Sequence, residues 1–225
     1  MNVTLTSLQL YNNNLGSEGG KALENALCKN TTLISLDLHN NYLGPRVGKA
    51  LANSLCRNNT LTSLNLKNNN LGSEGGKAIA NALCKNNKLK DLDISHNDLG
   101  SEGAKSLAHA LCNNTTLTCL NLKNNKLESE GGITLADSLC KNDTLKYLNI
   151  SCNDLGSEGG RALANALCKN TTLTSLSLQN NKIGSKCIEA LTNSNLKNAI
   201  SLDLTFNDFE LEENALADAL CKKTP

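Results

Sequence analysis

Leucines recur along this chain with a period of 28 residues. The first unit reads Leu5-x-x-Leu8-x-Leu10-x-x-Asn13-x-Leu15, and further units begin near residues 33, 61, 89, 117, 145, 173 and 199. A fixed period of about 20 to 50 residues is typical of proteins in which each unit packs only on its neighbours. We therefore expect residues 1–225 to form one domain, a solenoid of eight units.

The leucine spacing predicts a short strand in each unit. Leu8 and Leu10 are two residues apart, which places them on one face of a strand. Asn13 follows, and its amide can both donate to and accept from backbone groups of the turn and of the neighbouring unit. The repetition of this asparagine predicts a buried ladder of amides along the solenoid.

A short helix is predicted after each strand. In the first unit it follows Gly16, with Ser17 as the expected N-cap and Glu18 placed favourably for the helix dipole. Ala22, Leu23, Ala26 and Leu27 form an apolar stripe, and Gly20 would let the helix approach its strand. Parallel strands stack about 4.8 Å apart but packed helices need about 8–10 Å, so the two layers must curve. We expect an α/β horseshoe with a parallel sheet on the concave face and helices on the convex face.

The chain resembles leucine-rich repeat proteins of the ribonuclease-inhibitor-like subclass, which includes NOD-like receptors and Ran GTPase-activating protein. The resemblance covers practically the whole chain and implies the horseshoe fold. It does not select a function, because the subclass includes inhibitors, sensors, adaptors and a GTPase activator. The residues that carry it best are Leu61-x-x-Leu64-x-Leu66-x-x-Asn69-x-Leu71-Gly72-Ser73-Glu74-Gly75-Gly76 and Ala78-Ile79-Ala80-Asn81-Ala82-Leu83.

Most of the ten cysteines follow the repeat. Adjacent helices lie too far apart for disulfide bonds between equivalent positions, so we expect these cysteines to be small, buried residues that close each helix. The start of the chain shows neither the basic nor the apolar region of a signal peptide. Free thiols without an export signal favour a reducing, cytoplasmic location. The cysteines in this column are Cys28, Cys56, Cys84, Cys112, Cys140, Cys168 and Cys221.

The charge balance and the lack of catalytic or metal-binding motifs disfavour several classes of function. The chain has 22 Lys+Arg and 21 Asp+Glu, a balance that disfavours nucleic acid and anionic membranes as partners. No apolar run approaches the roughly 20 residues of a membrane span. His39, His96 and His109 are scattered, and the glycine-rich turns lack the Gly-Lys-Ser/Thr ending of a phosphate loop. We therefore expect no metal, no cofactor and no enzymatic activity.

Strand residues between the leucines face away from the core. The repeat does not determine which residue types occupy these positions. They form a small-polar surface with mixed charge, and the Trp and Arg typical of strong interfaces are missing from it. Asp91, Asp93, Lys67 and Lys123 form the candidate contact patch. The candidate protein-binding residues on the concave face are Tyr11, Asp37, His39, Lys67, Asp91, Asp93, Lys123 and Tyr147.

The two ends of the pattern differ. The last unit contains Phe206 and Phe209 and replaces the glycine-rich turn with residues 210–213, changes that we interpret as a cap. The first unit has no such cap, because Leu5 already belongs to its strand segment. We expect exposed apolar surface there, with an edge strand available for self-association.

These observations favour a non-enzymatic cytosolic protein that binds a protein partner on its concave face. One alternative is the ligand-sensing repeat region of a larger NOD-like-receptor-type protein. Another is a GTPase-activating protein resembling the Ran-directed family, although the uniform turns offer no loop residues that would organise a partner's catalytic site.

Overall fold

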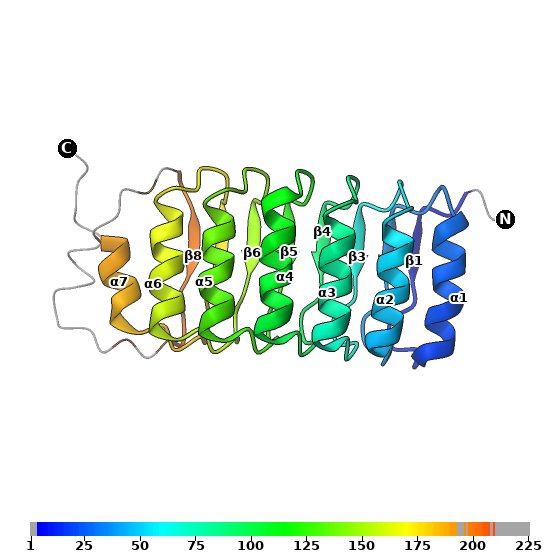
Figure 1. Cartoon of the computed structure of the whole chain (residues 1–225), viewed down its shortest axis with the longest axis horizontal. Coiled ribbons are helices and arrows are strands. Elements are labelled where there is room, and N and C mark those ends of the chain that lie inside the picture. Colours follow the sequence, from blue (N-terminus) through cyan, green and yellow to red (C-terminus); the bar gives the residue numbers. More distant parts are fainter. Residues whose placement is uncertain (1–3, 193–195, 197, 208, 210–225) are drawn as a thin grey trace.

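A computed structural model shows a single stack in which short strands alternate with helices (Figure 1). It describes residues 4–192, 196, 198–207 and 209, and these residues contain eight strands and seven helices. The strands are β1 (Ser7–Gln9), β2 (Ser35–Asp37), β3 (Ser63–Asn65), β4 (Asp91–Asp93), β5 (Cys119–Asn121), β6 (Tyr147–Asn149), β7 (Ser175–Ser177) and β8 (Ser201–Asp203). The helices are α1 (Gly16–Lys29), α2 (Gly44–Leu55), α3 (Gly72–Leu83), α4 (Gly100–Asn113), α5 (Glu128–Leu139), α6 (Gly156–Leu167) and α7 (Gly184–Thr192).

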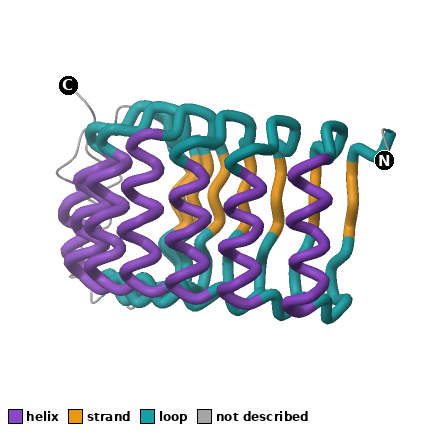
Figure 2. The backbone as a smooth tube through the Cα atoms, turned by 45° about the vertical axis from the view of Figure 1, so that its right-hand side comes forward, coloured by secondary structure: helices purple, strands orange, loops and turns teal. Residues whose placement is uncertain are grey.

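The strands form one open parallel sheet in the order β1 to β8. Equivalent residues pair across it: Leu64 lies opposite Leu92, one full repeat later. Between β7 and β8 the spacing falls to 26 residues, because Ser175 pairs with Ser201. Strands and helices occupy separate layers (Figure 2). The predicted α/β solenoid is thus confirmed.

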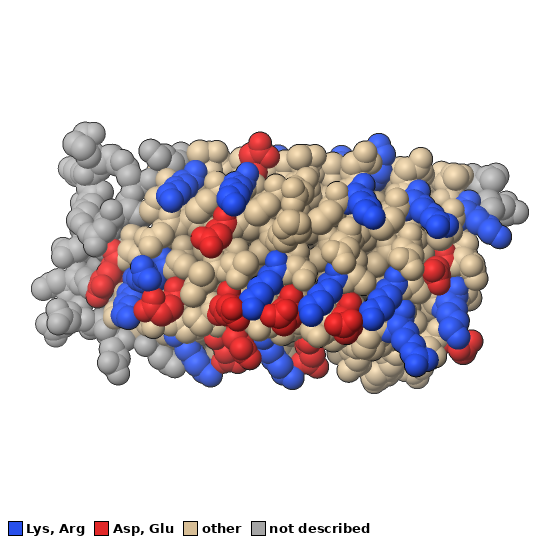
Figure 3. All heavy atoms as spheres, viewed as in Figure 1, with Lys and Arg blue, Asp and Glu red and all other residues tan. Residues whose placement is uncertain are grey.

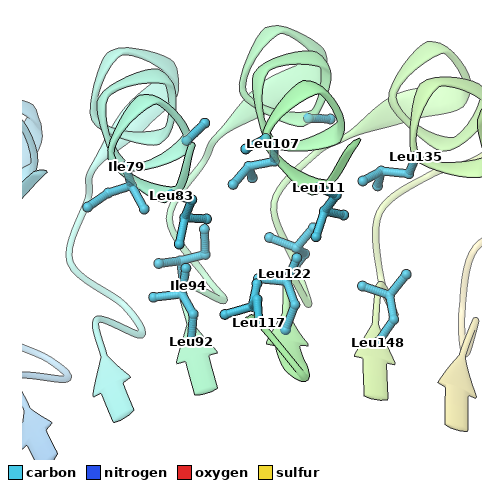
Figure 4. Close-up of a cluster of buried hydrophobic side chains, with 14 of the residues drawn as sticks. Ile79, Leu83, Leu92, Ile94, Leu107, Leu111, Leu117, Leu122, Leu135 and Leu148 are labelled. Atoms are coloured by element: carbon cyan, nitrogen blue, oxygen red, sulfur yellow. The ribbon is translucent and has the colours of Figure 1, made fainter. Parts of the chain in front are cut away.

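The hydrophobic core lies between the two layers. Leu92 of β4 and Ile94, which follows β4, point toward the helices, and Leu107 and Leu111 of α4 point back toward the strands (Figure 4). All four side chains are at most 1% exposed. Burial falls at the first unit, where Leu5 is 39% exposed, so the expected exposed apolar surface is present there.

A ladder of buried asparagines connects the units, as predicted. Asn97 Nδ2 donates to the carbonyl oxygens of Leu66, Ile94 and Ser95 at 2.9–3.1 Å. Asn97 Oδ1 accepts the N–H groups of Asn69 at 3.0 Å and Leu71 at 3.2 Å. Each rung therefore ties its own turn to the preceding unit. The buried members of the ladder are Asn41, Asn69, Asn97, Asn125, Asn153, Asn181 and Asn207.

A second asparagine ladder, which was not predicted from the sequence, runs along the helix C-termini. Asn86 Nδ2 donates to the Leu55 carbonyl at 2.8 Å, and Asn86 Oδ1 accepts the N–H of Leu89 at 2.8 Å. The equivalent residues are Asn58, Asn114, Asn142 and Asn170. Both ends of the strand segments of β3 to β7 are thereby held by a buried amide.

The prediction that Ser17 caps the first helix is wrong. Helix α1 already begins at Gly16, and the preceding residue, Leu15, makes no side-chain cap bond. Asn12, Asn14 and Gly16 take positive φ values, and this turn directs the Gly16 N–H to the carbonyl of Asn41 at 3.0 Å. The neighbouring unit therefore supplies the hydrogen-bond acceptor for the Gly16 N–H at the start of the helix, in place of a cap side chain.

The prediction of a buried cysteine column is also wrong. Cys28, Cys56, Cys84, Cys112 and Cys140 are exposed, and Cys168 is half-buried. The helices end here, and the leucine just before each cysteine takes the inward position, as Leu83 does before Cys84. Cys221 lies outside the described residues, as do residues 210–213 of the predicted cap. Phe209 packs against the core, whereas Phe206 is exposed.

Candidate protein-binding surface

A depression of about 300 Å³ lies on the exposed face of the sheet. It extends across six consecutive strands, from Gln9 of β1 to Tyr147 of β6, and most of the side chains that line it are polar. Four of the eight candidate residues line it: Asp37, Asp91, Asp93 and Tyr147. The depression therefore includes half of the candidate residues.

Two of these aspartates also have a local structural role. Asp93 Oδ1 accepts the Ser95 N–H at 2.9 Å and the Ser95 hydroxyl at 2.6 Å, while Asp93 Oδ2 accepts Asn121 Nδ2 at 2.9 Å. Asp37 Oδ1 likewise accepts the His39 N–H at 3.0 Å. This turn recurs in most units, so the fold partly dictates the last strand position. The same bond is made by Asn65, Asn121, Asn149 and Asp203.

Asp91 occupies the first strand position, which is more variable. Ser35 and Ser63 precede it in the sheet, and Cys119 and Tyr147 follow. Burial and the neighbouring carboxylates of Asp91 and Asp93, in that order, raise the pKa of the Cys119 thiol to about 12. The thiol therefore stays protonated and can donate a hydrogen bond to the exposed Asp91 carboxylate.

Tyr11 and His39 form a second group in the first two units. Their rings are stacked, with centroids 4.6 Å apart and an interplanar angle of 8°. His39 Nδ1 lies 2.8 Å from Asp37 Oδ1, which fixes the imidazole against the aspartate. Neither ring lines the depression itself. This pair presents an aromatic edge next to the carboxylate of Asp37.

Lys67 and Lys123 follow β3 and β5 and do not line the depression, so the candidate patch is divided. They lie instead near His96, whose pKa is lowered by burial and then by these two lysines, against the opposing effect of Asp93. Asn124 Nδ2 lies 2.9 Å from His96 Nδ1. An amide N–H can only donate, so this contact favours the neutral imidazole that carries its proton on Nε2.

Charged residues on the helix face form alternating stripes (Figure 3). The sequence places Glu18 favourably for the dipole of its own helix. The structure adds contacts between helices, because lysines of one helix reach the first-turn glutamate of the next. The pairs are Lys49–Glu74 at 3.0 Å, Lys77–Glu102 at 3.7 Å and Lys105–Glu130 at 2.8 Å. All are exposed, so each contributes little to stability on its own.

Other kinds of site find no support within the described ranges. There, no cluster of three or more His, Cys, Asp or Glu side chains could hold a metal ion. None of the helices described is long and apolar enough to cross a membrane.

The stacked strand-and-helix units define a class of curved solenoid, and comparison with known proteins identifies its family. The family pattern described as "Leucine Rich repeat" matches residues 2–23, 57–80, 85–108, 113–136, 141–164 and 169–191. These segments together cover more than half of the chain. The chain therefore belongs to the leucine-rich repeat family. Comparison with curated protein sequences gives no significant match.

Several solved structures are similar to this chain. Leiomodin-1 Actin-Binding Site 2 is 29% identical, with a TM-score of 0.54, over 62% of this chain and 82% of that chain. The leucine-rich repeat-containing protein LegL7 from Legionella pneumophila is 27% identical, with a TM-score of 0.63, over 91% of this chain and 67% of that chain. The tropomodulin C-terminal domain from Caenorhabditis elegans shares the fold at 16% identity and a TM-score of 0.57. The match covers 66% of this chain and 90% of that chain.

Proposed function

We propose that this chain is a protein-interaction scaffold that binds a protein partner through the concave face of its sheet. The observation that carries the proposal is the polar depression across β1 to β6. Proteins of this repeat class are generally scaffolds, and their rigid stack presents one continuous surface to a partner. The depression supports this proposal, because Asp37, Asp91 and Asp93 are among the residues that line it and His39 of the stacked Tyr11–His39 pair contacts Asp37.

Asp91 is the residue on which the proposed contact depends most. Asp37 and Asp93 already accept hydrogen bonds from their own turns, whereas Asp91 is exposed at a position that serine occupies in β2 and β3. A basic side chain of the partner would gain a charge-assisted hydrogen bond there. Tyr147 would add apolar area at the opposite side of Cys119, in keeping with the role of tyrosine in interfaces.

Actin is the first partner to test, because one similar structure is named as an actin-binding site. The experiment measures binding of monomeric actin to the immobilised chain by biolayer interferometry. The informative variant is Asp91→Ser/Asp93→Asn. It removes two negative charges, and each new residue already occupies the equivalent position in another unit. We expect this variant to weaken actin binding at least tenfold.

The matched control is Glu74→Gln/Glu102→Gln, which removes two negative charges from the helix face. If actin does not bind, the same three proteins are used for cross-linking and affinity capture from cell extract, with recovered proteins identified by mass spectrometry. The proposal requires a partner that the concave variant loses and the control keeps. A partner lost only from the helix-face control would contradict it.

A further inference from the structure

The first unit exposes the apolar side that every inner unit buries. Leu8 and Leu23 are half-buried, whereas the residue equivalent to Leu8 in the next unit, Leu36, is 1% exposed. Together with Leu5 and Leu27 they line a cavity of about 290 Å³ that opens at this end of the stack. Beside it lies β1, the first strand of the open sheet. An edge strand beside an apolar cavity is a surface suited to pairing with another chain.

Helix α1 presents small residues on the same side. Gly19, Ala22 and Ala26 correspond to residues of α3 that face α2. In that inner pair the helices approach so closely that a Cβ on Gly48 would lie 3.0 Å from the Gly75 Cα. The outer side of α1 therefore has the shape that accepts another helix at short distance.

The charges on α1 make this end complementary to itself. In α3, α4 and α5 the first-turn glutamate accepts a lysine from the preceding helix. The equivalent residue in α1, Glu18, is 83% exposed and pairs with Lys21 of its own helix at 2.9 Å. Lys29, at the opposite end of α1, lines the apolar cavity. An acidic group thus marks one end of the helix and a basic group the other.

We propose that the N-terminal end of the solenoid is a homodimer interface, occupied by a second copy of this chain across a two-fold axis perpendicular to the sheet. This one operation runs β1 antiparallel to β1 of the second copy and α1 antiparallel to its α1. Glu18 and Lys29 are separated by about 16 Å along the helix, at 1.5 Å per residue. The antiparallel arrangement brings each Glu18 to the level of the second copy's Lys29.

A second copy satisfies both the apolar and the charged parts of this surface. The leucines of the two cavities would pack on each other, and two Glu18–Lys29 pairs would close the edges. Such an interface uses the same patch on both subunits and therefore closes at the dimer. The net charge of +1 adds little repulsion between copies.

The test is sedimentation velocity on the full chain over a wide concentration series. We expect a reversible monomer–dimer equilibrium. Ala26→Glu places a carboxylate in the apolar contact at a position that is exposed in the single chain, and we expect it to raise the dimer Kd at least tenfold. The matched control is Ile133→Glu, because Ile133 is 40% exposed on α5 and lies far from this end. The control should dimerise as the unmodified chain does.

A charge exchange tests the geometry. Glu18→Lys alone and Lys29→Glu alone should each weaken the dimer at low salt, because like charges would then face each other. The double variant Glu18→Lys/Lys29→Glu should restore it, and circular dichroism checks that every variant is folded. A monomer at all concentrations, assembly beyond the dimer, or a dimer unaffected by Ala26→Glu would overturn the proposal. Asp91→Ser should leave dimerisation unchanged, which separates this result from the concave-face proposal.

Discussion

At the residue scale, one amide can serve five backbone groups. The buried side chain of Asn97 donates hydrogen bonds to three carbonyl oxygens and accepts hydrogen bonds from two N–H groups. Aspartate would lose the donors, and serine is too short to reach across units. This ladder could be predicted from sequence because the asparagine recurs beside the leucines. The turns made by Asp37 and Asp93 were missed, although Asp or Asn recurs at that strand position too.

Replacing Asn97 with alanine should destabilise the chain by about 3 kcal/mol or more. The buried N–H groups of Asn69 and Leu71 lose their acceptor, and each unsatisfied buried group costs about 1–3 kcal/mol. Urea unfolding followed by circular dichroism measures the change in free energy of unfolding. The control is Asn81→Ala on the exposed face of α3, which should stay within about 0.5 kcal/mol. Equal effects of the two substitutions would show that the ladder does not stabilise the fold.

The Cys119 thiol should react much more slowly than the exposed cysteines. Only the thiolate is nucleophilic, and burial with the nearby carboxylates raises the pKa of Cys119 to about 12. At pH 8 we expect iodoacetamide to modify Cys119 at least roughly a hundredfold more slowly than Cys84. Peptide mapping by mass spectrometry gives both rates. Asp91→Ser should accelerate Cys119 only moderately, because burial is the larger cause; comparable rates at Cys119 and Cys84 would refute this account.

At the element scale, glycines set how closely consecutive units approach. The sequence suggested that Gly20 lets its helix approach the strand. The structure instead shows that an added Cβ at Gly20 would clash with the Val47 side chain of the next helix. The difference arises because periodicity reveals which positions need glycine, but does not reveal which neighbour fills the space.

The contact between α4 and α5 allows this packing to be tested. Ala104 stands where α1, α2, α3, α5 and α6 have glycine, and a Cβ on Gly131 would lie 2.8 Å from the Ala104 Cβ. We expect Gly131→Ala to destabilise the chain by about 1–3 kcal/mol, the usual cost of overpacking. Ala104→Gly in the same chain should recover much of this loss, because it removes the opposing methyl group. A double-mutant cycle by urea unfolding measures the coupling, and simple additivity of the two substitutions would refute the proposed contact.

At the scale of the whole molecule, the fold could be predicted, but the residues that line the depression could be predicted only in part. Periodic residues build the solenoid, so they identify strands, helices and core from the sequence alone. The candidate residues were selected from positions outside the leucine period, and their spacing in three dimensions depends on the stacking. Asp37, Asp91, Asp93 and Tyr147 line one depression, whereas Lys67 and Lys123 do not. The sequence could not distinguish these groups, because all of them follow the same alternation.

The stack also determines how the molecule should lose its structure. Helices contact the next helix and strands the next strand, so stability is carried by nearest neighbours. Leu120 lies fully buried in β5, whereas Leu8 is half-buried in the first unit. Leu120→Ala should cost about 2–5 kcal/mol, because the cavity weakens contacts to two neighbouring units. Leu8→Ala should cost less, because Leu8 is less buried and has one neighbouring unit among those described.

Native-state hydrogen exchange measured by mass spectrometry distinguishes local from global loss of stability. With Leu120→Ala, we expect amides in units 4 to 6 to lose protection most, with smaller changes in unit 2. With Leu8→Ala, the loss should stay in the first two units. If either substitution lowered protection equally along all described strands, the chain would unfold as one cooperative body, and nearest-neighbour coupling would be too strong for a local opening to be observed. Graded protection would instead show that each unit depends mainly on the units it touches.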